Sequence, residues 1–508
     1  MSKDNNKNLN IDLTGKPYSS IVIMSIVLLA TFAGALMQTS LGTAIPKLMD
    51  DFDIDFSTAQ QATTWFLLAN GIMVPISAFL ATRFSNRWLY IISYSVLLIG
   101  LVVTAIAPSE SKYWVVFLFG RIITAIAVGI MLPLMQILIL NMFPRNKRGV
   151  AMGLSGLAVG LAPAMGPTFA GWILNKNHII LGITITDSWR NIFVIPIIAV
   201  AIALVLSIFY MREIIPNRKI KFDFTSLILS CVGFGLFLWG FTNVSSKGWG
   251  DLTYVILPIV LSIILLGIFC IIQLKSADPF LNIRVFKSKG FTIATIGIIT
   301  VTMAMYGVEM TLPTYLQNIH GLSPFKSGLT LLAGAVMLGL ISPIAGSLYN
   351  KVGIKRLSFV GFSILTIASI PFAFLSETTS TTLILVLYAM RMFGVALVMM
   401  PLTTGAMDAL TTEDATHGTA VNNTARQIAS SIAVAVLTSI TQNIINNNEP
   451  AHALKDANPL KYADHIQQAS MDGFNTSFAI GIVFAIVGLL MVPFLRSHSS
   501  IDHKEGLK

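Results

Sequence analysis

The chain has 508 residues, of which 55% are hydrophobic and only 11% are charged, and its formal net charge is +10. This composition excludes an ordinary soluble domain, in which about a quarter of the residues are charged, and it predicts a protein that crosses a lipid bilayer many times. The positive charge does not indicate nucleic-acid binding, because the basic residues are spread over many short loops instead of forming one stripe.

Apolar segments of about 20 residues, each long enough to cross a ~30 Å hydrocarbon core, recur along the whole chain. They start near residues 20, 59, 88, 113, 147, 189, 224, 252, 290, 325, 355, 381, 418 and 474. Long continuous segments predict helices, since a membrane barrel would show short alternating segments instead. The sequence therefore predicts an all-α polytopic membrane protein with 14 transmembrane helices.

The orientation follows from the basic residues. The first apolar segment follows a polar, Asn-rich leader without a small-residue cleavage site, so we expect it to stay as the first helix. With both termini in the cytoplasm, 22 Lys and Arg lie in inside segments, 8 in outside segments and three within helices. This asymmetry fits the positive-inside rule and predicts a multi-pass protein of a bacterial-type plasma membrane.

The chain also repeats itself. "GTAIP", which ends at Pro46, resembles "EMTLP", which ends at Pro313, at an offset of 267; "AFLATRFSNRW" resembles "GSLYNKVGIKR" at 268. Arg121 and Arg391 precede "MLPL" and "MMPL" at 270, and "RGVAMG" resembles "HGTAVN" at 269. Four ordered matches at nearly one offset predict two homologous six-helix halves. Parallel repeats of this kind occur in secondary transporters, with the substrate site between the halves.

The repeat predicts a division of the chain into five parts. These are a cytoplasmic tail (1–19), the first six-helix half (20–211), a linker with two extra transmembrane helices (212–289), the second half (290–496) and a cytoplasmic tail (497–508). We expect the basic start of the linker to lie along the anionic inner leaflet, which makes membrane lipid an expected partner. The outside loop from about 446 to 473 is expected to contain a short surface helix.

The fifth predicted helix reads "GLSGLAVGLAPAMGPTFAG", and "DSWRNIF", "DPFLNIRVF" and "LPTYLQNIHGLSP" follow it in order. These motifs resemble those of the major facilitator superfamily and, within it, the fourteen-helix drug:proton antiporter family. Gly153, Gly166, Pro167 and Gly171 match the antiporter motif. The resemblance implies a monomeric secondary transporter that uses the proton gradient, needs no cofactor, and exports hydrophobic or amphipathic, often cationic, compounds.

The sequence departs from this family at the cytoplasmic gate. The loop between the second and third helices has Thr82 where the superfamily has an Asp, and Asn350 occupies the equivalent place in the second half. Arg83 and Arg87 remain in the first loop and Lys351 in the second. We therefore expect a gate that includes these four polar or basic residues and relies on neutral hydrogen bonds instead of an acid-mediated latch.

Glu309 is the candidate proton carrier. It lies about 18 residues into the ninth helix, and Thr295, Thr302 and Tyr306 share its face at helical spacing. A proton and a cationic substrate would compete for this carboxylate, which is the outline of an antiport mechanism. One alternative is a permanent pair with an arginine that only fixes helix packing. The other is a purely substrate-recognising role.

Three arginines lie within predicted helices. The resemblance associates Arg121 with proton transfer, in which an always-charged arginine can tune Glu309 but cannot carry the proton. Arg391 is its repeat equivalent, and a structural role satisfied by backbone carbonyls is the alternative. Arg426 shares a helix face with Asn422, and we expect it to extend toward the nearby inner end of its helix.

The substrate cavity is expected to be lined from the first, second and ninth helices. Aromatic surfaces accept flat, amphipathic ligands and attract cations. The candidate residues are Phe32, Gln38, Trp65, Asn70 and Tyr306. Packing in the core or against lipid is the alternative for most of them.

Other functions find less support. The sequence lacks the Gly-rich phosphate loop that an ATP-driven pump would need. It also lacks the paired carboxylates, metal cluster or activated nucleophile that would indicate an enzyme. Export of a physiological metabolite or a lipid-like molecule stays open as an alternative to drug export. A transporter-derived sensor is less favoured, because the antiporter motif and Glu309 are both present.

Overall fold

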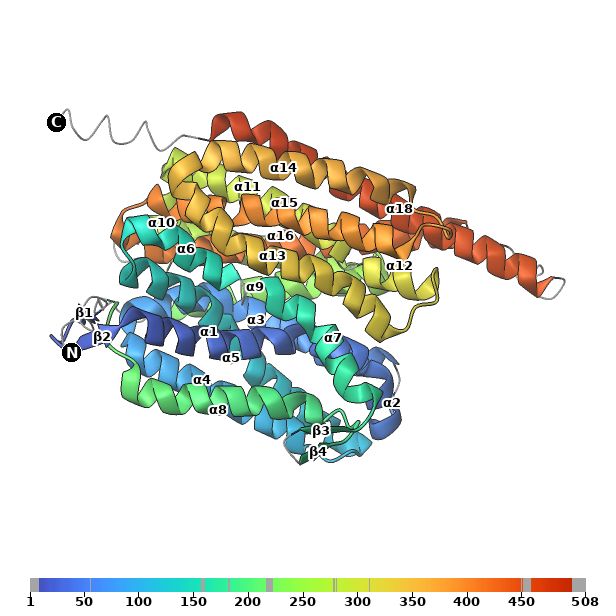
Figure 1. The fold of residues 1–508 in the computed structure, drawn as a ribbon, viewed down its shortest axis with the longest axis horizontal. Helices are drawn as coiled ribbons and strands as arrows, with labels where there is room; N and C mark the ends of the chain where they lie inside the picture. Colours follow the sequence, from blue (N-terminus) through green and yellow to red (C-terminus); the bar gives the residue numbers. More distant parts are fainter. Residues whose placement is uncertain are drawn as a thin grey trace, which may run out of the picture.

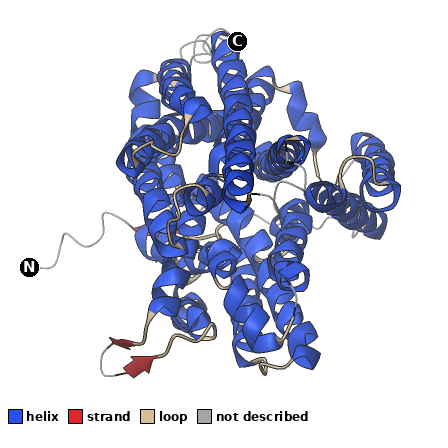
Figure 2. Cartoon of the chain, turned by 90° about the vertical axis from the view of Figure 1, so that its right-hand side faces the viewer, coloured by secondary structure: helices blue, strands red, loops and turns tan. Residues whose placement is uncertain are grey.

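The computed structural model describes residues 9–54, 56–156, 160–180, 183–215, 223–276, 279, 281–309, 311–448, 450 and 458–495. Within these residues, long helices run side by side along one axis (Figure 1), and Figure 2 shows the same helices end-on. The first and last described residues lie at the same end of the bundle, on the left of Figure 1. We call this the terminal end and the opposite one the far end.

The first half occupies the lower part of Figure 1 and the second half the upper part. The helices of the first half are α1 (Ser20–Thr39), α2 (Ile45–Phe52), α3 (Phe56–Arg83), α4 (Asn86–Ile106), α5 (Trp114–Met142), α6 (Arg145–Gly156), α7 (Ala162–Asn175) and α8 (Asn191–Tyr210). Two further helices follow, α9 (Phe224–Lys247) and α10 (Leu257–Lys275). Those of the second half are α11 (Lys289–Glu309), α12 (Leu312–Asn318), α13 (Pro324–Val352), α14 (Ile354–Ser369), α15 (Thr381–Asp408), α16 (Thr412–Asn447) and α18 (Pro459–Met491).

Among the described residues, 12 helical segments are long and apolar enough to cross a membrane. Two predicted crossings are not among these 12. They are the second, formed by α3, and the fifth, formed by α6 and α7. Most predicted starts lie within a few residues of the observed ones. The last helix differs, because α18 begins at Pro459, where the side chain of Asn458 accepts a hydrogen bond from the backbone N–H of Lys461. The predicted surface helix is thus the first part of α18.

The described chain also contains four short strands that the sequence analysis did not predict. They form two antiparallel hairpins, β1 (Leu9–Ile11) with β2 (Pro17–Ser19) and β3 (His178–Ile180) with β4 (Ile183–Ile185). The first hairpin lies at the terminal end and the second at the far end (Figure 1). Three residues are too few to show the alternating pattern by which a strand is predicted.

Buried apolar side chains form two large clusters that follow the repeat. One runs from Tyr18 to Ile215, and the other is drawn mainly from residues 281–495. The inserted helix α9 packs against α10, against α3 of the first half and against α16 of the second. It therefore contacts both halves.

The first crossing of each half is divided at an equivalent place. α1 is followed by a 3₁₀ turn and by α2, which has Pro46 in its first turn. α11 ends at Glu309, and α12 has Pro313 in its first turn. Proline is favoured at the first positions of a helix because its missing N–H costs nothing there. Glu309 is the last described residue of α11 and lies within the apolar span Lys289–Asn318, so it belongs to the ninth predicted crossing as expected.

Candidate functional site: a cavity between the halves, buried charges and a latch

A cavity of about 70 Å³ lies between the two halves. The first half contributes residues of α1, α3 and α5 to its wall, and the second half contributes residues of α11 and α16. The lining residues are Gln38, Asn70, Val74, Leu132, Pro133, Thr302, Tyr306, Asn423, Arg426, Gln427 and Ser430. Most of these side chains can form hydrogen bonds.

The structure brings together Gln38, Asn70 and Tyr306 of the five predicted lining residues. Trp65 instead pairs with Trp239 of α9, with ring centroids 5.6 Å apart, and Phe32 packs against the apolar cluster of the first half. The lining is thus less aromatic than expected. The reason is that α9 occupies one side of α3, a packing that helical periodicity does not indicate.

Arg426 lines the cavity instead of extending to the end of its helix as predicted. Asn422, expected on the same face, is buried and is not among the lining residues. The adjacent Asn423 links the halves, because its Nδ2 donates a hydrogen bond of 2.7 Å to Oε1 of Gln136 on α5. The sequence analysis missed this contact, which joins residues 287 positions apart.

Arg121 and Arg391 are fully buried and occupy equivalent surroundings. Arg121 Nη1 donates to the carbonyl oxygen of Met37 in α1 at 3.0 Å, and Arg391 Nη2 donates to that of Ala304 in α11 at 3.0 Å. The offset of 267 that relates Pro46 to Pro313 also pairs Met37 with Ala304.

The remaining contacts of the two arginines are also alike. Each guanidinium lies over a phenylalanine ring, Arg121 over Phe66 at 4.2 Å and Arg391 over Phe372 at 5.4 Å. Each Nε donates a further hydrogen bond, and each guanidinium keeps one terminal nitrogen without a hydrogen-bond partner. Both arginines therefore hold the first helix of their own half in place.

Glu309 has a buried Oε2 without a hydrogen-bond partner. In the described part of the chain, no lysine or arginine lies within ion-pair distance of it. Arg391 is the cation within longer electrostatic reach of Glu309, and Tyr306 and Tyr388 are within its reach as well. Arg121 instead contacts α1 and α3. The structure therefore gives no support to a permanent ion pair at Glu309.

The glycines of the antiporter motif do not share one neighbour. A Cβ atom at Gly153 would lie 2.5 Å from the carbonyl oxygen of Ser342 in α13, so α6 and α13 touch through their backbones. Gly171 of α7 also faces α13, at Phe325, whereas Gly166 faces the end of α1. Pro167 lies within α7.

Residues 157–159 of this crossing lie outside the described part of the chain. Gly160 and Leu161 have π-helical geometry and lead directly into α7, which begins at Ala162. The described part of the motif therefore combines a local change in helix geometry with close packing against the second half.

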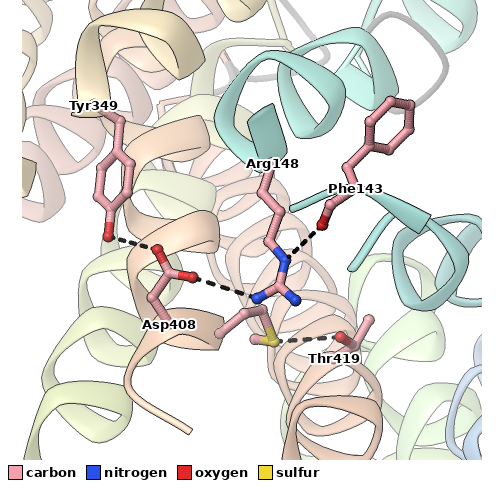
Figure 3. Close-up of polar contacts among 6 residues, drawn as sticks. Phe143, Arg148, Tyr349, Asp408 and Thr419 are labelled. Carbon is pink, nitrogen blue, oxygen red and sulfur yellow. Dashed lines mark hydrogen bonds and ion pairs between the residues drawn. The ribbon is translucent and has the colours of Figure 1, made fainter. Parts of the chain in front are cut away.

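An ion pair joins the halves at the terminal end (Figure 3). Nη1 of Arg148 in α6 lies 3.8 Å from Oδ1 of Asp408, the last residue of α15. The hydroxyl of Tyr349 in α13 donates to Oδ2 of Asp408 at 3.0 Å, and Arg148 Nε donates to the carbonyl oxygen of Phe143 at 3.2 Å. The side chain of Arg148 is only 15% exposed and that of Asp408 only 8%. We call Arg148 and Asp408 the latch.

The latch differs from the predicted gate. Arg83 is the last residue of α3, Arg87 donates to the carbonyl oxygen of Ile208 within the first half, and Asn350 and Lys351 are exposed. The inter-half contact is an acid–base pair, not the neutral contact that was expected. The acid of this pair, Asp408, lies at the end of α15. The gate was predicted from the loop that has Thr82 in place of the family's Asp, so that loop gave no sign of Asp408.

The latch borders a second cavity, of about 480 Å³, at the terminal end. Tyr349 and Asp408 form part of its wall, together with Lys287 and Lys289 near the start of α11. One side of the latch therefore faces open space, in which dissolved ions can screen it.

Comparison with known proteins identifies the family. Residues 27–434 match the profile of the Major Facilitator Superfamily. The lincomycin resistance protein LmrB of Bacillus subtilis is 36% identical over 488 residues, covering 96% of this chain and 98% of LmrB. The multidrug export protein EmrB of Escherichia coli K12 is 28% identical over 441 residues, covering 85% of this chain and 82% of EmrB.

A solved structure agrees in fold. The proton:xylose symporter XylE, bound to 6-bromo-6-deoxy-D-glucose, has a TM-score of 0.57 at 16% identity, covering 94% of this chain and 97% of XylE. The chain is thus a secondary transporter of small molecules in the cell membrane and not an enzyme, as predicted. It belongs to the major facilitator superfamily.

Proposed function

We propose that the protein exports hydrophobic or amphipathic small molecules in exchange for protons, by alternating access, and that it acts as a monomer. The observation that carries this proposal is the polar cavity, which takes its wall from both halves of the repeat. Such a cavity opens to one side or the other as the halves rock against each other. The names of LmrB and EmrB, which refer to drug resistance and export, support the direction of transport.

The proposal includes 14 crossings with both termini in the cytoplasm. To the 12 segments described above it adds α3, with 28 residues, and the pair α6 and α7. An even number of crossings returns the chain to the side on which it began. This agrees with the common position of the first and last described residues in Figure 1.

Glu309 is the proton carrier in this proposal. Its buried Oε2 lacks a hydrogen-bond partner, and a buried charge without a partner is costly, so binding of a proton stabilises the site. Tyr306, one helical turn earlier, lines the cavity and connects the carboxylate to the substrate space. Arg391 is within electrostatic reach of Glu309, so we assign to it the tuning role that the family resemblance gave to Arg121.

Reconstitution in liposomes tests this proposal. Purified protein is placed in vesicles that contain the pH indicator pyranine, a pH gradient is imposed, and uptake of lincomycin and of ethidium is followed. We expect wild type to couple uptake of at least one compound to proton flux. Glu309→Gln should abolish gradient-driven uptake but keep exchange of the compound across the membrane, because the neutral amide mimics the protonated carboxyl group.

Glu110→Gln is the matched control, since Glu110 is exposed and pairs with Lys112. It should behave like wild type. Substrate-linked proton flux that survives unchanged in Glu309→Gln would remove Glu309 from the coupling role.

A further inference from the structure

Two residues that line the cavity between the halves each carry a buried hydrogen-bond donor without a partner. Nδ2 of Asn70, on α3, and Nε of Arg426, on α16, are buried and have no hydrogen-bond partner among the described residues. Asn70 as a whole is only 4% exposed. A buried donor without an acceptor is unfavourable, so these two atoms indicate where a ligand supplies acceptor oxygens.

The charge of the cavity points to the same kind of ligand. Among the described residues that line it, Arg426 is the only charged one and none is a carboxylate. Arginine stays charged in a protein and binds carboxylate groups through a planar set of donors. A cationic ligand would instead meet a like charge. The lining therefore differs from what the expectation of cationic substrates requires.

We propose that this cavity binds the carboxylate of an amphipathic organic acid, with Asn70 and Arg426 as its donors. The inference rests on the proposed transport function and narrows its substrate class. The two donors come from different halves, so one carboxylate held by both would bridge the halves. The cavity of about 70 Å³ has room for such a group only, because drug-sized ligands occupy about 300–1,000 Å³. The apolar remainder of the substrate enters when the halves move apart.

A matched pair of fluorescent ligands tests this inference. Dansyl-leucine carries a carboxylate, and dansyl-leucinamide is its neutral counterpart with almost the same shape. Binding of each to purified, full-length protein in detergent is measured by dansyl fluorescence and by calorimetry. We expect wild type to bind the acid about tenfold more tightly than the amide, the change that one charge-assisted contact produces.

Substitutions assign the effect to the two donors. Arg426→Gln should remove the preference for the acid and leave amide binding within about twofold of wild type, while Arg426→Lys keeps most of the preference because it keeps the charge. Asn70→Ser should weaken binding of the acid more than that of the amide. Arg356→Gln, which removes an exposed basic residue outside the cavity, is the matched control for net charge and should change nothing.

Three results would overturn the inference. The first is that wild type binds the acid and the amide equally. The second is that Arg426→Gln weakens binding of both compounds equally, which is expected if Arg426 only packs against Tyr306. The third is that neither compound binds. If Arg426→Gln does not fold, Arg426→Lys and Asn70→Ser decide the question. Acid-selective binding without proton-driven transport would reject the antiport proposal but keep this inference, so the two proposals fail separately.

Discussion

Arg121 and Arg391 show how a buried charge can organise a membrane bundle. Each guanidinium is removed from water, donates to a carbonyl oxygen in the first helix of its half, and lies over an aromatic ring. These contacts offset part of the desolvation cost of the charge. The two sites are related by the repeat, but among the described residues a carboxylate, Glu309, lies within electrostatic reach of Arg391 and none does so for Arg121. In the proposed mechanism, the same structural element therefore combines with proton coupling in one half only.

Removal of either arginine should destabilise the protein. Arg121→Gln and Arg391→Gln leave a buried carbonyl oxygen without its donor, which costs about 1–3 kcal/mol. We expect both variants to unfold at lower temperature in detergent, as followed by tryptophan fluorescence. Arg391→Gln should in addition change the pH dependence of transport, whereas Arg121→Gln should not. A changed pH dependence for Arg121→Gln at unaltered stability would contradict this division of roles.

At single positions, the repeat and the charge pattern gave the usable signals. The equivalence of Arg121 and Arg391 follows from the offset alone and agrees with their matching contacts. Glu309 was selected as a candidate because a carboxylate is rare in an apolar segment, and its coupling role stays a prediction. Asp408 was missed because it lies at a helix end, where acids are common. Its partner Arg148 is 260 positions earlier in the chain, and the sequence showed that residue only as one more basic loop residue.

Among the elements, α6 and α13 make the closest contact between the halves. A Cβ atom at Gly149 or Gly153 would meet the backbone of α13, at Gly346 or at Ser342 and Pro343. Glycine at these positions lets the two helices touch at the terminal end. The sequence analysis found the antiporter motif in this helix, but the motif did not identify α13 as the partner helix. The sequence analysis also did not predict that the first crossing of each half is divided. The apolar segments that contain Pro46 and Pro313 are long enough to cross the membrane as one helix.

Filling this contact should open the terminal end. Gly149→Val cannot fit against Gly346, so α6 and α13 must separate, at a cost of about 1–3 kcal/mol. Gly171→Ala is the control, because a Cβ atom there lies 3.6 Å from Phe325, which is an ordinary contact. The measurement is the labelling rate of Ser342→Cys by a maleimide, in protein whose two native cysteines, Cys231 and Cys270, are replaced.

We expect faster labelling in the Gly149→Val background and an unchanged rate with Gly171→Ala. Equal rates in all three backgrounds would show that this contact does not control access to the terminal end.

In the whole molecule, the two halves are joined by contacts of different strength. The backbone contact of α6 with α13 and the hydrogen bond between Asn423 and Gln136 are close, while the latch spans 3.8 Å and borders open space. A transporter must close one end without making it permanent, since each state has to be left again. An ion pair at 3.8 Å that borders open space suits this need, because distance and dissolved ions both weaken its attraction. The two-half architecture was predicted from the repeat, but the position of the halves relative to each other was not, because it depends on pairs of residues far apart in sequence.

Breaking the latch should shift the balance between open and closed states without unfolding the protein. Asp408→Asn removes the ion pair but leaves an acceptor oxygen for the hydroxyl of Tyr349. A loss of about 1 kcal/mol is about a fivefold change in the ratio of the states, which can be read from distances between spin labels on α6 and α13.

Arg148→Gln should produce the same shift, and the double variant should add little to either single one, since both remove one interaction. The exchanged pair, Arg148→Asp with Asp408→Arg, should restore part of the closed state. Additive shifts, with no recovery on exchange, would show that the two residues act separately and that the terminal end is held by helix packing alone.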